Sequence, residues 1–576
     1  MHEGDNAPGI VPASLPETTD VLIVGGGPVG SALAAELRLR GVRCLVVEKE
    51  TEIPDTPVRA MYLNMRTLEH FRRWGIADQL RCAATTPREW QFDVTFCTSL
   101  TGRELGLYRA LAYRESEVGD IAAEAAQSVM QFVANRVLRD RAGELGAVVA
   151  TRWDCTSITQ TADGVVAEVV GVHNAERRTV RARYAVGCDG ARSLVRAAAQ
   201  IQRLGRGGLG MYMLIHWRAP RLRQAVTIGP AAFILVFNPD TKGLIHRIDE
   251  NRWTVHVPGF APDEDISGFD VHGAVREYMG SDDIDFEITY AGPYKFHELI
   301  AETYRNGNLF LAGDAAHLYP PFGGHNMNSG FDDAVNLGWK LAAELQGWGG
   351  QGLLDSYTAE RRPIALRNAT EATRNAKQFA LAAKEVGGAM SWEVLNASGP
   401  DAEARRRAYG EQLWQTTIRN WMNDGIVLDQ RYQQSPVIVD DGSAEPEWDP
   451  ARYIPFAKPG HRAPHARTAD GNSLYDSFGL GYTLLAFDHA KPHDVEAIVE
   501  AADARHVPLN VLRLDDRDIA ELYDDPLVLI RPDQHVAWRG TTAPDDPSAL
   551  VDILRGAGEA TQDKSGEIAL NRRSAS

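Results

Sequence analysis

The chain of 576 residues is too long for a single hydrophobic core, so two or three domains are expected. Hydrophobic residues make up 44% of it and charged residues 24%, as in globular proteins, and no apolar stretch is long enough for a membrane span. The formal net charge of −18 repels nucleic acid and anionic membranes. We therefore expect a small-molecule ligand, no nucleic acid and no membrane, with a homodimer as a further candidate association.

The two ends of the chain are polar and predict disordered tails at residues 1–19 and 557–576. The first tail has neither the basic nor the apolar region of a signal peptide, which predicts a cytoplasmic protein. The five cysteines include no CxxC pair, and HExxH and GxSxG are also missing from the sequence. No disulfide framework, no metal site and no hydrolase nucleophile are predicted.

Residues 20–50 predict a dinucleotide site. A β-branched run is followed by Gly25, Gly27 and Gly30 in GxGxxG spacing, an Ala/Leu-rich helix and a second apolar run that ends at Glu48. The first glycine permits a tight turn, the second lets the backbone approach a pyrophosphate, and the third allows close packing of the helix. The acidic residue at the end of the second strand is placed to accept hydrogen bonds from a ribose. The predicted site also includes Pro28 and Lys49.

A second glycine-rich match, at residues 205–210, is expected to be a plain loop. No apolar strand precedes it, and the residues behind it, "MYMLIHWRA", have the pattern of a strand where a nucleotide site needs a helix.

Two further stretches accompany the first glycine motif. "YAVGCDGARSLVR", residues 184–196, is a short apolar strand followed by Asp-Gly. "GDAAHLYPPFGGHNMNSGFDDAVNLGWKL", residues 313–341, passes through Pro-Pro and Gly-Gly and continues with apolar positions at helical spacing, which predict a helix from about 329 to 345. Together the three motifs resemble the fingerprints of the FAD-dependent aromatic hydroxylases of the para-hydroxybenzoate hydroxylase type.

The resemblance implies roles for several residues around an FAD. Asp189 would help to hold the pyrophosphate region and contact the nicotinamide cofactor, and Asp314 would bind the ribityl chain. Arg59 would lie over the FAD and Gln131 would contact it, while Asn135 stands where a glutamate is frequent. The remaining residues that the resemblance assigns to the cofactor are Pro321, Gly324, Met327 and Asn328.

The Pro-Pro and Gly-Gly turn is expected to form a rigid wall beside the isoalloxazine ring, because proline fixes φ and glycine admits close contact. In the family the following helix directs its N-terminus at the flavin N1–C2=O edge. Asn326 stands where related sequences usually have glycine, and asparagine tolerates left-handed φ. The amide of Asn326 and the ring of His325 are each candidates for a hydrogen bond to flavin or substrate. The alternative is that both side chains face solvent.

Residues 85–125 and 201–300 are expected to form a β-sheet that roofs the flavin and shapes a substrate pocket. The second block is rich in aromatic and β-branched residues. The candidate catalytic residues are Tyr212, His216, Pro321 and Asn326, and further pocket candidates are Trp217, Phe233, Phe237, His246 and His256. Alternation along the strands does not decide which of them face inward.

The predicted fold class is therefore α/β. A Rossmann-like FAD-binding domain (20–200 and 301–400) is interleaved with the substrate sheet and followed by a helical linker region, 401–457. A Gly/Pro/Arg-rich linker, 456–473, leads into the last domain. This domain, 458–556, resembles the thioredoxin-like domain of the larger hydroxylases but contains no cysteine, which excludes thiol redox chemistry.

The resemblance implies that NADH or NADPH reduces the FAD, O2 adds at flavin C4a, and a phenolic ring attacks the resulting hydroperoxide. The C-terminal domain and the motif variant favour a polyketide or similarly fused phenol as the substrate. Baeyer–Villiger oxidation or epoxidation, a non-oxygenating flavin dehydrogenase or halogenase, and a non-enzymatic scaffold are the alternatives. A halogenase is expected to carry WxWxIP, which the sequence lacks. The regiochemistry, the catalytic base and the choice of nicotinamide stay open.

Overall fold

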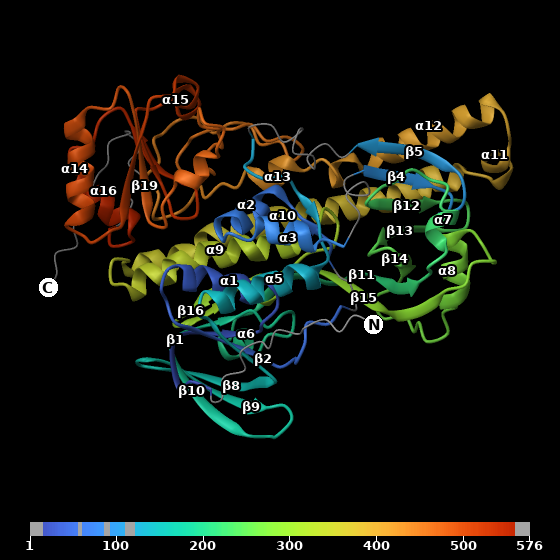
Figure 1. The fold of residues 1–576 in the computed structure, drawn as a ribbon, viewed down its shortest axis with the longest axis horizontal. Coiled ribbons are helices and arrows are strands. Elements are labelled where there is room, and N and C mark those ends of the chain that lie inside the picture. The colour runs from blue at the N-terminus through green and yellow to red at the C-terminus, as the bar shows by residue number, and fades with distance from the viewer. Residues whose placement is uncertain (1–14, 56–59, 86–92, 110–120, 559–576) are drawn as a thin grey trace.

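The computed structural model describes residues 15–55, 60–85, 93–109 and 121–558. Figure 1 shows the C-terminal domain and the substrate sheet at opposite ends of the molecule, with the dinucleotide-binding sheet below and helices α9 (His325–Leu345) and α10 (Gln351–Ala389) running between them. Arg59, the predicted FAD-covering arginine, lies outside the described residues. Within the described ranges, no helix is long and apolar enough to cross a membrane.

The dinucleotide-binding sheet has the strand order β16-β17-β10-β1-β2-β7, and β8 and β9 extend it from β10. Its central strands are parallel and almost fully buried, as expected for a sheet covered on both faces. β1 starts at residue 18, so residues 18 and 19, which were predicted to belong to the N-terminal tail, are part of this sheet. The strands are β1 (Thr18–Val24), β2 (Cys44–Glu48), β7 (Val148–Thr151), β8 (Trp153–Thr161), β9 (Gly164–Gly171), β10 (Arg177–Gly187), β16 (Arg305–Asn306) and β17 (Leu309–Leu311).

The substrate sheet has the order β18-β15-β11-β14-β13-β12-β4-β5 and is mainly antiparallel. The predicted interleaving is confirmed, because β4 and β5 come from the first block of the chain and the others from the second. The strands are β4 (Asp93–Cys97), β5 (Glu104–Arg109), β11 (Arg203–Arg218), β12 (Phe233–Phe237), β13 (Lys242–Arg247), β14 (Arg252–Phe260), β15 (Glu287–Ala301) and β18 (His317–Leu318). A small separate sheet pairs β3 (Tyr62–Leu63) with β6 (Gln127–Ser128).

The prediction of a plain loop at residues 205–210 is wrong, because these residues belong to β11. The pairing of β11 with β15 shifts register between Arg206 and Gly210, so the glycines form an irregular segment of a strand. A Cβ at Gly205 would lie 2.0 Å from the backbone oxygen of Glu298 on β15, so glycine allows the two strands to approach closely.

The helices cover the sheets and connect the domains. They are α1 (Pro28–Leu39), α2 (Met65–Arg73), α3 (Ala77–Ala83), α5 (Gln131–Glu144), α6 (Leu194–Ala198), α7 (Leu222–Ala225), α8 (Val271–Met279), α9, α10, α11 (Trp392–Asn396), α12 (Pro400–Thr417) and α13 (Asp424–Leu428), with 3-10 turns η3 (Gly313–Ala315) and η4 (Ile418–Asn420). The helical linker region predicted for 401–457 is helical only in its first half, since no helix lies between residues 429 and 457.

The C-terminal domain has the sheet order β20-β19-β21-β22, with β19 parallel to β20 and antiparallel to β21. The chain thus forms a βαβ unit, β19-α14-β20, followed by the antiparallel pair β21 and β22. The supposed linker 456–473 is part of the domain, because Ala457, Ala463 and Ala466 are buried in its core. The elements are β19 (Tyr482–Phe487), β20 (Leu509–Leu514), β21 (Leu527–Ile530), β22 (Val536–Gly540), α14 (Pro492–Asp503), α15 (Arg517–Tyr523) and α16 (Pro547–Leu554), with the turn η5 (Leu474–Ser477).

Candidate active site

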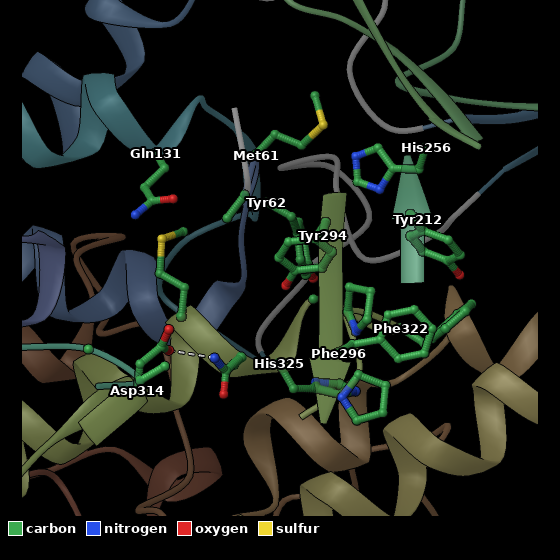
Figure 2. Close-up of a pocket in the computed structure, with 18 of the residues that line it drawn as sticks. Met61, Tyr62, Gln131, Tyr212, His256, Tyr294, Phe296, Asp314, Phe322 and His325 are labelled. Carbon is green, nitrogen blue, oxygen red and sulfur yellow. Dashed lines mark hydrogen bonds between the residues drawn. The ribbon is translucent and has the colours of Figure 1, made fainter. Parts of the chain in front are cut away.

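A cavity of about 1230 Å³ extends from the β1–α1 turn to the substrate sheet. Figure 2 shows Gln131 and Asp314 on one side of it and Tyr212, His256 and Phe322 on the other. The predicted site residues that line it are Gly25, Gly27, Pro28, Glu48, Lys49, Gln131, Asp189, Tyr212, Asp314, Pro321, Gly324, Asn326 and Met327. The fold therefore brings residues from all three motifs to one cavity.

The three glycines of the first motif have different surroundings. Gly25 has a φ of +102°, and a Cβ there would lie 2.4 Å from the backbone oxygen of Cys188. A Cβ at Gly30 would lie 2.0 Å from the oxygen of Gly25, so this glycine packs the helix against the turn. A Cβ at Gly27 meets nothing within 4 Å. The open space in front of the N-terminus of α1 is therefore the cradle that a pyrophosphate would fill.

Glu48 helps to build this turn as well as lining the cavity. Its Oε2 accepts a hydrogen bond from Gly26 N at 2.7 Å, and its Oε1 accepts one from Glu50 N at 2.8 Å. Arg139 donates from Nη2 to the oxygen of Gly26 at 2.7 Å. This arginine was not predicted from the sequence. It lies on the same helix as Gln131, two turns later, and this helical spacing is the signal that would have found it.

Asp189 caps the short helix α6, because its Oδ2 accepts from Leu194 N at 2.6 Å and from Val195 N at 3.2 Å. Its Oδ1 is buried and has no hydrogen-bond partner among the described residues. Burial raises the pKa of this carboxyl group despite its hydrogen bonds. An unsatisfied carboxylate oxygen on a residue that lines the cavity fits a donor from a bound dinucleotide.

Helix α9 starts at residue 325, four residues earlier than the sequence predicted. Gly323 and Gly324 precede it with left-handed φ values of +84° and +67°. Asn328 does not line the cavity: its Nδ2 donates to the oxygens of Tyr62 at 3.0 Å and Gly324 at 2.7 Å. It fixes the turn and does not contact the cavity, contrary to the expected cofactor contact. The early start brings the backbone N–H groups of α9 to the cavity wall.

Asn326 and His325 both lie in the first turn of α9. Asn326 donates from Nδ2 to Asp314 Oδ1 at 2.6 Å, the bond drawn dashed in Figure 2, and its Oδ1 lies 3.1 Å from Nδ1 of His317. His325 is 3% exposed, and burial lowers its pKa to about 3, so its ring is neutral. The alternative that both side chains face solvent is therefore wrong.

The far part of the cavity is an aromatic chamber closed by the substrate sheet, α10 and η4. Two histidines interrupt its aromatic walls. Burial lowers the pKa of His246 well below its ordinary value and that of His256 to about 4, so both rings are neutral. His246 donates from Nδ1 to the oxygen of Ala232 at 3.3 Å, which leaves Nε2 as an acceptor. The aromatic residues of the chamber are Tyr212, Phe233, Phe237, Tyr294, Phe296, Phe322, Phe379 and Trp421.

His216 does not line the cavity, contrary to its prediction as a catalytic residue. It shares a face of β11 with Tyr212 but lies four residues farther along, where it is 1% exposed and its ring packs 5.2 Å from that of Tyr290. Trp217 points to the opposite face and is buried in a separate core cluster. Alternation along a strand fixes the face of a side chain but not its distance from a pocket.

The described residues contain no group of His, Cys, Asp or Glu side chains that would hold a metal ion. One dinucleotide cradle that opens into an aromatic chamber defines a dinucleotide-dependent oxidoreductase acting on an aromatic compound. The open cradle at Gly27 and the unsatisfied oxygen of Asp189 both fit a bound FAD.

Comparisons with known proteins identify the family. Residues 18–372 match the family described as "FAD binding domain", and residues 457–557 match "Aromatic-ring hydroxylase, C-terminal". The chain is 32% identical to tetracenomycin B2 monooxygenase-dioxygenase of Streptomyces olivaceus, over 92% of this chain and 97% of the relative. It is also 32% identical to a putative polyketide hydroxylase of Streptomyces halstedii, over 90% and 93%. The solved structure of the rebeccamycin biosynthetic enzyme RebC with reduced flavin superposes with a TM-score of 0.84 at 33% identity, covering 94% of this chain and all of that one.

The chain belongs to the FAD-dependent aromatic-ring hydroxylases. It is a flavin-dependent monooxygenase that uses FAD as its cofactor, O2 as its co-substrate and a reduced nicotinamide as its reductant. The scaffold, the halogenase and the dehydrogenase considered from the sequence are excluded by this membership.

Proposed function

We propose that the protein hydroxylates a phenolic, fused-ring compound of the polyketide type. The observation that carries the proposal is the aromatic lining of the chamber, which shares one cavity with the dinucleotide cradle. Flat aromatic walls stack on a planar ring system over a large area and make few demands for hydrogen bonds. Two relatives are named for tetracenomycin and for polyketide substrates, which supports the same class.

Bound FAD would supply the activation of O2 and the transfer of one oxygen atom to the substrate. The chain's own residues bind, orient and exclude water. The backbone N–H groups at the start of α1, with Gly27 as the point of closest approach, would hold the pyrophosphate, and Glu48 would accept from the ribose. Pro321 and the N-terminus of α9 form the wall for the flavin ring.

Substrate orientation falls to the neutral histidines and to Tyr212 at the far end of the chamber. The Nε2 of His246 accepts a hydrogen bond from a substrate hydroxyl, and the low pKa of this ring makes it an acceptor that does not take the proton. Phe296 and Phe322 pack around Tyr212, with ring centroids 5.0 and 6.3 Å from it, and fix one side of the chamber. Burial of these groups keeps water from the reacting atoms.

The test uses the purified holoenzyme with NADH or NADPH, ¹⁸O2 and matched panels of monocyclic and fused-ring phenols. We expect a fused-ring phenol to accelerate nicotinamide oxidation and to gain one ¹⁸O atom as a hydroxyl group. Acceleration and labelling with monocyclic phenols alone would overturn the substrate class. If the ¹⁸O label appears in a ring ester or an epoxide, the reaction is a Baeyer–Villiger oxidation or an epoxidation and not a hydroxylation.

We place the reaction in the cytoplasm, where reduced nicotinamides are supplied. The homodimer stays a prediction, and sedimentation of the holoenzyme at several concentrations tests it.

A further inference from the structure

Asn326 connects the side chains of Asp314 and His317 at the edge of the cavity. Its Nδ2 donates to Asp314 Oδ1 at 2.6 Å, and its Oδ1 lies 3.1 Å from Nδ1 of His317. The carboxylate fixes the orientation of the amide, because a flipped amide would place two oxygens 2.6 Å apart. The amide oxygen therefore accepts, and Nδ1 of His317 donates to it.

The other ring nitrogen of His317 faces the buried carboxylate of Asp333. It lies 2.8 Å from Oδ2 of Asp333, which also accepts from Gly313 N at 3.1 Å, while Arg361 Nε donates to the second carboxylate oxygen at 2.9 Å. Burial alone would raise the pKa of Asp333, but His317 and Arg361 hold it below its ordinary value, so this carboxylate only accepts. The two ring nitrogens of His317 thus face two acceptors, the amide oxygen of Asn326 and the carboxylate of Asp333.

The connection runs from the protein interior to the cavity. His317 and Asp333 are 0% and 1% exposed, whereas Asp314 is exposed and lines the cavity. Tyr319 stacks on the ring of His317 with centroids 4.8 Å apart, which keeps the ring in one orientation. Asn326 thus lies between a buried histidine and an exposed carboxylate, and a glycine at this position supplies neither hydrogen bond.

We propose that Asn326 is a positioning residue for the cofactor, which holds the Asp314 carboxylate in one rotamer and links it to the buried pair of His317 and Asp333. The proposal rests on the assignment of Asp314 to the FAD within the proposed function. A charge-assisted hydrogen bond that holds a flexible carboxylate in place reduces the cost of ordering it when the ligand binds. We expect Asn326→Ala to weaken FAD binding about tenfold, the scale of one hydrogen bond to a charged group.

Titration of the full-length apoprotein with FAD, followed by quenching of flavin fluorescence, tests this without any substrate. The variants are Asn326→Ala, Asn326→Asp, Asp314→Ala and the double variant Asp314→Ala/Asn326→Ala. The matched control is Gln346→Ala, which removes an exposed amide at the other end of α9 that donates to Arg40 O. The melting temperature of each apoprotein checks that the fold is kept.

If Asn326 acts through Asp314, the double variant binds FAD as weakly as Asp314→Ala alone. Asn326→Asp binds more weakly than Asn326→Ala, because it places a second carboxylate beside the first. In Asn326→Asp the added negative charge makes the midpoint potential of the bound flavin more negative, whereas Gln346→Ala leaves affinity and potential unchanged.

Three results would overturn the proposal. If Asn326→Ala weakens FAD binding by the same factor in the wild type and in Asp314→Ala, the two residues act independently. Wild-type affinity and potential in Asn326→Asp would show that the amide donor is not needed. Wild-type affinity in Asp314→Ala would remove the assignment on which the proposal rests, while the substrate experiment would still stand or fall by itself.

Discussion

Two glycines of one motif, two residues apart, are expected to fail in different ways when substituted. A Cβ at Gly25 would lie 2.4 Å from the oxygen of Cys188, and its φ of +102° is a conformation that side-chain-bearing residues rarely adopt. Gly25→Ala should therefore destabilise the apoprotein, by about 1–3 kcal/mol for the backbone strain and more for the contact. Gly27 has ordinary extended φ and ψ of −70° and −175° and no neighbour to its Cβ within 4 Å.

Gly27→Val should keep the apoprotein within about 1 kcal/mol of the wild type, the scale of an unfavourable N-cap residue. The branched side chain instead occupies the open cradle in front of α1. FAD at about 100 times its dissociation constant stabilises the wild-type fold by about 2.7 kcal/mol, and this increment should vanish in Gly27→Val.

The assay is urea or thermal unfolding of each variant with and without FAD, together with the yellow colour of the purified protein. The expected pattern is an unstable apoprotein for Gly25→Ala and a stable but colourless one for Gly27→Val. An FAD-dependent increase in the stability of Gly27→Val equal to that of the wild type would refute the placement of the pyrophosphate.

Other predictions concern the domain contact, pH and the chamber. Glu360→Gln should lower the free energy of unfolding in urea by about 3–5 kcal/mol, because it leaves Arg531 and Lys340 buried without their shared carboxylate. Burial alone would raise the pKa of Glu360, but Arg531 and Lys340 lower it to about 2. The stability that the ionised carboxylate adds to the fold is therefore complete above about pH 4.5 and is lost as the pH falls towards 2. Acid titration followed by ellipticity should show a shallower loss of structure in Glu360→Gln than in the wild type. His246→Phe should raise KM for a phenolic substrate roughly tenfold in steady-state kinetics without changing FAD affinity, and a changed FAD affinity with unchanged KM would contradict the assigned acceptor.

The dinucleotide half of the site could be predicted because its chemistry lies in short, local motifs. The turn at Gly25, the strand end at Glu48 and the helix between them depend on neighbours in sequence, and the structure has them as expected. The motif of residues 313–341 predicted the turn and the helix. The helix starts before the first residue of the apolar pattern, because its first turn has free backbone N–H groups at the cavity wall and does not yet belong to the core face.

The substrate half could not be predicted to the same degree. Its residues come from strands distant in sequence, so the face and the depth of each side chain depend on pairing registers that alternation does not give. His216 and Tyr212 were equivalent in the sequence, yet only Tyr212 lines the cavity. The glycine-rich segment 205–210 was mistaken for a loop because its pairing with β15 is a long-range contact.

The cysteine-free C-terminal domain is best explained by its contact with α9. Arg531 donates from two nitrogens to Glu360 of α10 at 2.7 and 2.8 Å, and Lys340 of α9 donates to the same carboxylate at 2.6 Å. Trp339 Nε1, also of α9, donates to Asp533 of the C-terminal domain at 3.3 Å. All five side chains are buried, so these bonds hold the middle of the helix whose first turn forms the cavity wall. The last domain therefore helps to hold α9 in place, and a redox group in it would have no part in this role.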